Sequence, residues 1–372
     1  MASARIQGLT MPKWGLSMNR GKVVQWLVSE GSSVTAEMDI VEVESEKITG
    51  AVPTPAAGIL RRQVASPGDD LPVGALLGVI ADAETDDATI DSFVEEAATT
   101  VEIDETEITT VAPESVLLGD RKIRYLRRGD GSPTIVLIHG FGGNLNNWLF
   151  NHEVLAEERT VYSVELPGHG QSSKDVGDGS LDTLVQVILD WFSAVSLNEA
   201  HVVGHSLGGA IATQLAHQAP EKVQSCTLIA SAGLGTDING DFLNGMIQTS
   251  RRKQLKPQLE KLFADPGLVT RQLVDDMLKF KRLDGVEQAL QTIADQMMDP
   301  EGNQAHHVRE QLGGLNVPVQ VLWGEDDQII PASHAAGLSG ESLVVRVLPG
   351  YGHMVHMEAA ADVNRAIAEI AS

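Results

Sequence analysis

A single acidic stretch divides this chain and limits what it can fold into. No Lys or Arg occurs between Arg62 and Arg121, and twelve Asp and Glu lie from Asp82 to Glu114. Such a segment buries too little apolar surface to fold alone, and its charges repel one another. We therefore predict an extended, mobile linker over residues 83–113. The alternative is a short surface helix, which the spacing of four apolar residues would suit: Ile90, Phe93, Val94 and Ala97.

The overall composition excludes several classes of protein. The 372 residues hold 27 Lys and Arg against 51 Asp and Glu, a net charge of −24, whereas nonspecific binding to nucleic acid or anionic membranes needs a basic surface. Cys226 is the single cysteine, so neither an intrachain disulfide nor a CxxC metal site can form, and we expect no metal. Neither a membrane-spanning run nor the apolar core of a signal peptide is visible. We expect a cytoplasmic protein without nucleic-acid or membrane partners.

The first predicted domain, residues 1–82, consists of short strand-like runs that nearly repeat. An offset of 37 residues aligns six pairs: Gly21 with Gly58, Val23 with Leu60, Gly31 with Gly68, Val34 with Leu71, Ile40 with Leu77 and Val43 with Ile80. Two copies of one β unit predict a flattened, pseudo-symmetric β sandwich. Between the copies, the alternation of apolar and acidic residues over 40–52 predicts a hairpin with Lys47 at its tip.

The residues around this hairpin closely resemble a lipoyl domain, and the resemblance covers almost all of residues 5–82. It rests on four segments: Met11–Met18, Trp26–Gly31, Glu42–Lys47 and Pro53–Gly58. The resemblance implies that Lys47 carries lipoic acid in amide linkage. The related biotinyl domain has Met on both sides of its lysine, where this chain has Glu46 and Ile48, so lipoate is favoured over biotin. The usual Asp-Lys pair is Glu46-Lys47 here.

The second predicted domain, residues 114–372, alternates strand-like runs with helical patterns. Six short, continuous apolar runs indicate parallel strands that are covered by helices on both faces: 135–138, 161–164, 201–203, 226–229, 319–322 and 344–347. After the third of these runs, Gly204-His-Ser206-Leu207-Gly208 opens a helical stretch. This is a Gly-x-Ser-x-Gly nucleophile elbow in its strand–turn–helix context, so Ser206 is the candidate nucleophile.

Further motifs supply the other parts of a serine-dependent site. His139-Gly-Phe141-Gly-Gly follows an earlier strand, and the amides of Phe141 and Leu207 are the candidate oxyanion donors. Together with Leu166-Pro-Gly-His-Gly-Gln-Ser172, these motifs resemble the α/β-hydrolase superfamily. That resemblance implies Asp327 as the acid of the triad, with Asp326 as the alternative, and His353 as the base. His356 and the remaining histidines are interpreted as packing or surface residues.

Between the fourth and fifth strands the pattern becomes helical, which predicts a helical cap over about residues 233–316. Within it, residues 251–282 hold nine Lys and Arg against four Asp and Glu. This basic segment fits a mouth for a phosphate-bearing substrate such as coenzyme A, a docking surface for the acidic linker, or a solvated helix face; we favour the solvated face.

The combination of domains closely resembles the dihydrolipoamide acetyltransferase (E2) component of bacterial acetoin dehydrogenase complexes. It implies a multidomain chain: an N-terminal all-β lipoyl-type sandwich, a flexible acidic linker and a C-terminal α/β-hydrolase fold with a helical cap. The implied reaction transfers an acetyl group from S-acetyldihydrolipoyl-Lys47 to coenzyme A through an acyl-serine. The implied partners are a thiamine-dependent E1 and a flavin-dependent dihydrolipoamide dehydrogenase (E3).

Two departures from ordinary 2-oxo-acid dehydrogenase E2 chains leave room for alternatives. The chain has no His-x-x-x-Asp-Gly acyltransferase motif, and the acidic linker leaves no place for a small basic subunit-binding domain. One alternative is a lipoyl-tethered esterase, thioesterase or C–C bond hydrolase. The other is a carrier and scaffold that does no chemistry.

Overall fold

In a computed structural model, the chain forms two compact units, one up to Thr110 and one from Val111 onward. The structure describes residues 6–100, apart from 13, 15–17, 19, 37 and 46–48, and residues 112–372, apart from 341; the side chains of 95–100 are not described. Each unit is considered by itself. No helix in this described part is long and apolar enough to cross a membrane.

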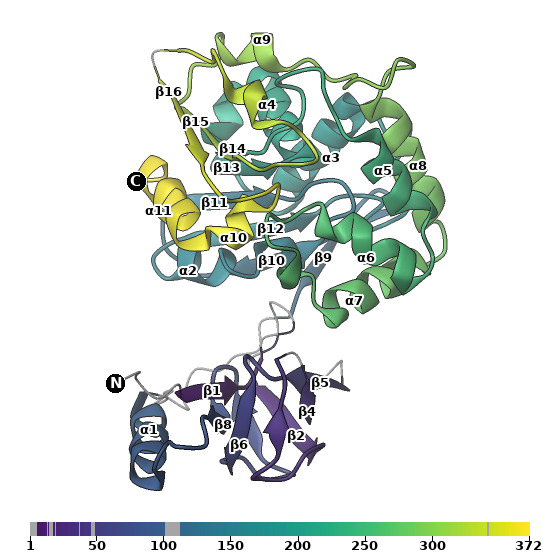
Figure 1. Cartoon of the computed structure of the whole chain (residues 1–372). Coiled ribbons are helices and arrows are strands. Elements are labelled where there is room, and N and C mark those ends of the chain that lie inside the picture. Colours follow the sequence, from purple (N-terminus) through teal and green to yellow (C-terminus); the bar gives the residue numbers. More distant parts are fainter. Residues whose placement is uncertain are drawn as a thin grey trace. The chain divides into compact units, whose positions relative to one another are not determined.

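The described strands of the first unit form two antiparallel four-stranded sheets, with orders β1-β8-β6-β3 and β5-β4-β2-β7 (Figure 1). The strands are β1 (Ile6–Thr10), β2 (Arg20–Trp26), β3 (Ser33–Val34), β4 (Asp39–Glu44), β5 (Thr49–Pro53), β6 (Gly58–Gln63), β7 (Asp70–Pro72) and β8 (Leu76–Ala81). The 37-residue offset maps β2, β3 and β4 onto β6, β7 and β8. The two sheet orders are therefore copies of each other, which confirms the predicted pseudo-symmetric sandwich.

Aligned positions of the repeat supply the core of this sandwich. Val23 and Leu60 are both fully buried, as are Ile40 and Leu77. Val43 and Ile80 pack into the same cluster. Residues that match across the repeat therefore pack into one apolar layer between the two sheets. In this way two copies of a small β unit bury apolar side chains that one copy alone would leave exposed.

The segment after the sandwich differs from the prediction of an extended linker. Helix α1 occupies Asp87–Thr100, which favours the alternative of a short helix for this part of 83–113. Its Ile90 is fully buried. Arg61 pairs with Asp87 at 3.0 Å, and Arg62 pairs with Asp91 at 3.2 Å. Two arginines of the folded sandwich thus offset the repulsion between acids that argued against a helix. Residues 101–111 lie outside the described part.

The described strands of the second unit form one eight-stranded sheet in the order β16-β15-β14-β13-β11-β12-β10-β9. The strands are β9 (Glu114–Leu118), β10 (Arg121–Arg128), β11 (Thr134–Ile138), β12 (Thr160–Glu165), β13 (Ala200–His205), β14 (Val223–Ile229), β15 (Val319–Gly324) and β16 (Leu343–Leu348). The six predicted runs are confirmed as β11 to β16, and these strands pair in parallel. Two further strands that the sequence pattern did not predict, β9 and β10, extend the sheet in antiparallel pairs.

Helices cover both faces of this sheet (Figure 1). The core on one face includes residues of α3 (Leu181–Ala194), α4 (Leu207–Gln218) and the cap helices. The core on the other face includes residues of α2 (His152–Ala156) and α11 (Ala360–Ile370). The short α10 (Val355–Glu358) precedes α11, and four single 3₁₀ turns in the described residues are η1 (Leu145–Trp148), η2 (Pro220–Lys222), η3 (Pro266–Leu268) and η4 (Ala332–Ala335).

The long connection from β14 to β15 is helical, within the range expected for a cap. It contains α5 (Gly240–Gln248), α6 (Arg252–Glu260), α7 (Arg271–Lys281), α8 (Val286–Met297) and α9 (Arg309–Leu312). Leu255 and Leu259 of α6 are buried one turn apart, and the polar residues of that helix face outward. Helix α6 thus has a single apolar stripe, which requires it to pack on a surface rather than stand alone.

Candidate active site

Ser206 lies at the turn between β13 and α4, with backbone angles φ 53° and ψ −116°. A non-glycine residue in this region is strained by about 1–3 kcal/mol and is retained where its neighbours enforce it. The neighbours here are glycines with no space for a side chain. A Cβ on Gly204 would collide with the backbone of Gly208, and a Cβ on Gly208 would collide with the carbonyl of Ile138. The tight packing of the two glycines therefore holds Ser206 in place.

His353 and Asp327 meet through a short hydrogen bond, in which His353 Nδ1 donates to Asp327 Oδ2 at 2.7 Å. Asp327 is 9% exposed and His353 is 2% exposed. Asp326 points into solvent and lies outside this contact. The sequence left Asp326 and Asp327 as alternatives for the acid, and the fold places Asp327 in contact with His353.

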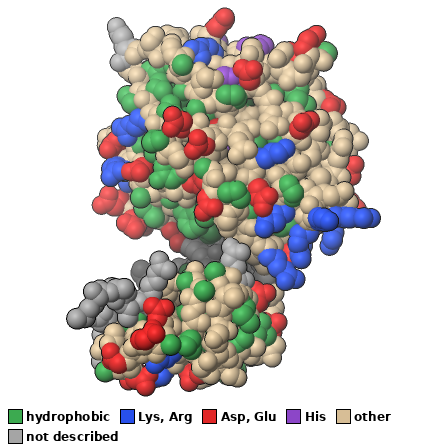
Figure 2. Space-filling model, viewed as in Figure 1, with side chains coloured by type: hydrophobic (Ala, Val, Ile, Leu, Met, Phe, Trp, Pro, Cys, Tyr) green, Lys and Arg blue, Asp and Glu red, His purple; other side chains and the backbone are tan. Residues whose placement is uncertain are grey.

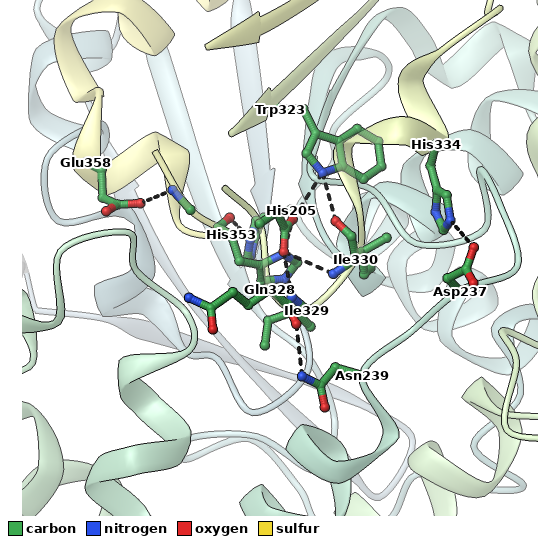
Figure 3. A network of polar contacts seen from close by, with 12 residues as sticks. His205, Asp237, Asn239, Trp323, Gln328, Ile329, Ile330, His334, His353 and Glu358 are labelled. Atoms are coloured by element: carbon green, nitrogen blue, oxygen red, sulfur yellow. Dashed lines mark hydrogen bonds and ion pairs between the residues drawn. The ribbon is translucent and has the colours of Figure 1, made fainter. Parts of the chain in front are cut away.

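Asp327 is itself fixed by three further donors. The indole Nε1 of Trp323 donates to Oδ2 at 3.0 Å, and the amides of Ile329 and Ile330 donate to Oδ1 at 2.8 and 3.0 Å. Figure 3 shows these residues grouped beside His353. A carboxylate that accepts this many hydrogen bonds cannot rotate freely. It can therefore orient the imidazole and stabilise a positive charge on it.

A second histidine supports the loop that carries His353. His205 Nε2 donates to the carbonyl of His353 at 3.0 Å, and the two rings lie 4.7 Å apart between centroids. Burial lowers the pKa of His205 well below its usual value, and the neighbouring His356 and His353 lower it further. His205 is therefore a neutral donor, a role that the sequence analysis did not assign to it.

The candidate oxyanion donors lie beside the nucleophile. A Cβ on Gly140, one residue before Phe141, would lie 2.8 Å from the Cβ of Ser206. Among the hydrogen bonds of the described residues, none uses the backbone amide of Phe141 or of Leu207 as a donor. Two unused amides next to a serine hydroxyl suit the stabilisation of a negatively charged oxygen.

Two buried histidines, which the sequence suggested only as packing or surface residues, shape this loop. Gly142 N–H donates to His169 Nε2 at 3.0 Å, and Leu166 N–H donates to His139 Nε2 at 3.1 Å. Burial lowers the pKa of His139 to about 4 and that of His169 to about 3. Both rings are therefore neutral near pH 7 and can accept these bonds. Their adjacent glycines, in His-Gly and Pro-Gly-His-Gly, are the sequence signal that could have indicated this role.

Glu358 joins the loop of His353 to the cap. Its carboxylate accepts hydrogen bonds from Gly352 N–H at 2.6 Å and from Ala264 N–H at 2.8 Å; Figure 3 shows its side chain directed at this loop. Met354 N–H also donates to the carbonyl of Leu262 at 3.0 Å. These hydrogen bonds hold the segment that follows α6 next to the loop of His353, the candidate base.

His356 is a packing residue, as expected. It is fully buried between the rings of Trp148 and His205, at centroid distances of 4.7 and 4.5 Å. Neither ring nitrogen has a hydrogen-bond partner of good geometry among the described residues, although the backbone of Asn147 slightly favours the charged ring. Burial dominates and lowers the pKa to about 3.

Lys47, Glu46 and Ile48 lie outside the described residues. The strands on either side are described: β4 and β5 pair antiparallel, with Glu44 opposite Thr49. The chain therefore reverses between them, within the few residues that include Lys47. A lysine between the ends of two paired strands is suited to a covalently attached group that must reach beyond the protein.

The comparisons with known proteins match both units. A profile of the α/β-hydrolase fold matches residues 133–360, and a profile described as biotin-requiring enzyme matches residues 7–80. The dihydrolipoyllysine-residue acetyltransferase component of the acetoin cleaving system of Pseudomonas putida is 47% identical over 365 residues, 97% of each chain. The protein of the same description from Cupriavidus necator is 44% identical and covers 97% of this chain and 96% of its own.

A solved structure matches the second unit alone. A meta-cleavage product hydrolase from Pseudomonas fluorescens IP01 superposes with a TM-score of 0.63 at 22% identity, covering 69% of this chain and 96% of its own. At this level of identity the likeness concerns the fold.

Proposed function

The chain belongs to the family of dihydrolipoyllysine-residue acetyltransferase components of acetoin cleaving systems, and we propose that its two units carry out one acetyl transfer with Ser206 as the nucleophile. The first unit would present the acetyl group and the second would pass it to coenzyme A. The observation that carries this mechanism is the 2.7 Å contact between His353 and Asp327, together with the hydrogen bond from His205 to the His353 carbonyl, because His205 directly precedes the strained Ser206.

Lys47 would hold lipoic acid through an amide bond to its side-chain nitrogen, a linkage that removes the charge of the lysine. The bound group supplies a thiol on a long arm, on which an acetyl group travels as a thioester. The β4–β5 hairpin fits this role because its paired strands, rigid up to Glu44 and Thr49, would present the arm at one end of the sandwich.

In the first half-reaction, His353 Nε2 removes the proton of Ser206 as its oxygen attacks the carbonyl carbon of the acetyl thioester. The amides of Phe141 and Leu207 stabilise the negative oxygen that forms. Asp327 stabilises the imidazolium. His353 then returns the proton to the departing thiol, and the acetyl group remains on Ser206 as an ester.

In the second half-reaction, His353 removes the proton of the coenzyme A thiol, and the sulfur attacks the acetyl-serine. The ester bond breaks, His353 protonates Ser206, and acetyl-coenzyme A leaves. Water must be kept away for transfer to exceed hydrolysis. Ser206 is 5% exposed and His353 is 2% exposed beneath the cap, which supports transfer to a thiol that is bound in place.

Other subunits are expected, because the relatives are named as components of a cleaving system. We assign the loading of the arm to a thiamine-dependent E1 and its reoxidation to a flavin-dependent dihydrolipoamide dehydrogenase, E3. The second candidate function is a lipoyl-tethered hydrolase, because the same serine, histidine and aspartate could pass the acyl group to water instead of a thiol. A carrier without chemistry is disfavoured by the ordered contacts of Asp327, which a scaffold does not need.

The deciding experiment supplies the lipoylated, acetylated chain with coenzyme A and measures both acetyl-coenzyme A and free acetate. The proposal predicts acetyl-coenzyme A, and acetate alone would establish the hydrolase instead. Ser206→Ala should lower the rate by about 10³-fold or more. Transfer at an unchanged rate in this variant would refute the acyl-serine mechanism.

A further inference from the structure

The cap contains a concentration of positive charge that the reaction described above does not use. Residues 251–282 hold nine Lys and Arg against four Asp and Glu. The rest of residues 114–372 holds 11 Lys and Arg against 28 Asp and Glu. Figure 2 shows the blue side chains gathered where α6 and α7 lie in Figure 1. A positive region in an otherwise negative unit attracts anions of small size.

Two sets of contacts make this region one surface. Arg252 of α6 forms a bidentate pair with Asp275 of α7, with Nε and Nη2 at 3.0 and 2.7 Å from Oδ1 and Oδ2. The Lys281 amine at the end of α7 donates to the carbonyls of Met246 and Ile247 at the end of α5. The start of α6 and the end of α7 are thereby held next to each other.

Three exposed bases of this surface are left without an acidic partner. Arg251, Lys253 and Arg282 form no ion pair within the part of the chain that the structure describes, whereas Arg252, Lys256 and Lys279 each have one. We call these three residues the cationic surface. Unpaired guanidinium groups bind phosphate oxygens through two parallel N–H donors, and a lysine adds a point charge.

The cationic surface is connected to the active site on two sides. Met246, whose carbonyl binds Lys281, would have its Cε 3.3 Å from a Cβ on Gly142, next to Phe141. The segment after α6 binds the loop of His353 through Glu358 and Leu262. The segments on either side of α6 therefore adjoin the loops that carry Phe141 and His353.

We propose that the cationic surface binds the phosphate groups of coenzyme A, an inference that rests on the proposed function. Coenzyme A has phosphates at one end and its thiol at the end of a long, uncharged arm. The buried Ser206 requires the thiol to enter beneath the cap while the charged end remains at the surface. Arg251, Lys253 and Arg282 then determine the affinity for this substrate, and Ser206 and His353 determine the chemistry.

The first test measures binding without any acetyl donor. Isothermal titration compares the wild-type chain with the triple variant Arg251→Gln, Lys253→Gln and Arg282→Gln, using coenzyme A and then pantetheine, which has the thiol arm and no phosphate. The triple variant should bind coenzyme A about 10-fold more weakly, since three exposed charge contacts are lost. The affinity for pantetheine should be the same in both proteins.

The matched control removes three exposed arginines outside the cap, Arg127→Gln, Arg346→Gln and Arg365→Gln, which changes the net charge by the same amount. It should retain the wild-type affinity for coenzyme A. Equal weakening in both triple variants would overturn the site, because it would reflect net charge alone. Unchanged affinity for coenzyme A in the cap variant would also overturn the site and would show that the cationic surface is only a solvated helix face.

Kinetics distinguish this site from a surface for an acidic protein segment. With free S-acetyldihydrolipoamide as donor, the cap variant should show a KM for coenzyme A raised about 10-fold and a kcat within about twofold of wild type. If only the KM for the domain-bound donor rises, the surface binds a protein and the proposal is wrong. Formation of acetate alone by the wild type would refute the proposed function, while the titration would still report on the phosphate site.

Discussion

At the scale of residues, the candidate site depends on buried polar groups whose protonation states are set by their surroundings. Asp327 accepts four hydrogen bonds and is held as a carboxylate against His353. His139, His169 and His205 are kept neutral by burial. His353 is the ring that contacts the Asp327 carboxylate, which fits its proposed role as the base for Ser206.

Replacing Asp327 should therefore damage the chemical step. In Asp327→Asn the side chain keeps its size, but its amide can donate to Nδ1 and favour the imidazole tautomer that cannot take the serine proton. We expect kcat to fall about 10³-fold or more with little change in KM. The measurement is the initial rate of acetyl transfer from S-acetyldihydrolipoamide.

Asp326→Asn is the matched control for this substitution, because Asp326 is the exposed neighbour with the same chemistry. Its rate should stay within about twofold of wild type. Loss of activity in Asp326→Asn and retention in Asp327→Asn would show that the assignment of the acid is wrong.

At the scale of elements, the elbow between β13 and α4 depends on the absence of side chains. Gly204 and Gly208 pack against each other, and Gly209 packs against Ser231. Each contact brings backbone atoms closer than a Cβ allows. The strained turn at Ser206 is thus maintained by strand–helix packing.

Gly208→Ala should accordingly destabilise the second unit by about 3 kcal/mol, because the added methyl group meets the rigid carbonyl of Ile138. The free energy of unfolding in urea, followed at 222 nm, measures this effect. Gly313→Ala serves as the control: Gly313 has φ −68° and open space around it, so its change should stay below about 1 kcal/mol. Equal effects at the two positions would contradict this account of the elbow.

At the scale of the whole molecule, two units of different character must cooperate. The first is a small sandwich extended by α1, and the second contains every residue proposed for the chemistry apart from Lys47. The carrier and the catalyst should therefore be separable by mutation without loss of either fold.

Lys47→Arg should abolish acetyl-coenzyme A formation when the arm must be loaded by the thiamine-dependent E1 from acetoin, since arginine cannot form the amide. Transfer from free S-acetyldihydrolipoamide should remain within about twofold, because the second unit is unchanged. Lys22→Arg, an exposed lysine on β2, is the control. Loss of both activities in Lys47→Arg would mean that the units do not act independently.

The buried histidines make the stability of the second unit depend on pH. Their pKa values are lowered on folding, to about 4 for His139 and about 3 for His169 and His356. The unfolded chain therefore binds more protons below pH 6.5. The contribution of these histidines to the free energy of unfolding is fully present above that pH and is lost as the pH falls toward 3–4. Each histidine contributes up to about 1.4 kcal/mol per pH unit.

Urea unfolding at pH 7, 6 and 5 tests this dependence. His356→Phe keeps a ring against Trp148 and removes one titrating group, so its slope should be smaller, by about 0.7 kcal/mol between pH 7 and 6 and by about 1.2 kcal/mol between pH 6 and 5. An unchanged slope would show that His356 is not kept neutral by the fold.

Much of this protein could be predicted from the sequence where the pattern is local. The runs of β11 to β15 are continuous because both faces are buried, whereas the edge strand β16 is only partly buried. The elbow and the repeat are visible in the positions of glycines. β9 and β10 were missed because a strand such as Arg121–Arg128 alternates buried Ile123 and Tyr125 with charged residues at the edge of the sheet. At Asp87–Thr100 the linker was preferred to the short helix because the local pattern does not show that Arg61 and Arg62 pair with Asp87 and Asp91.

By itself, the sequence determined the two folds, the candidate nucleophile Ser206 and the candidate base His353, because each depends on residues within a few positions of it. Only the tertiary structure decided between Asp326 and Asp327, since the choice depends on a loop 26 residues away. It also decided which histidines are neutral and joined the segments on either side of α6 to the loops of Gly142 and His353. Burial and proximity between distant segments arise when the chain packs, and no local pattern encodes them.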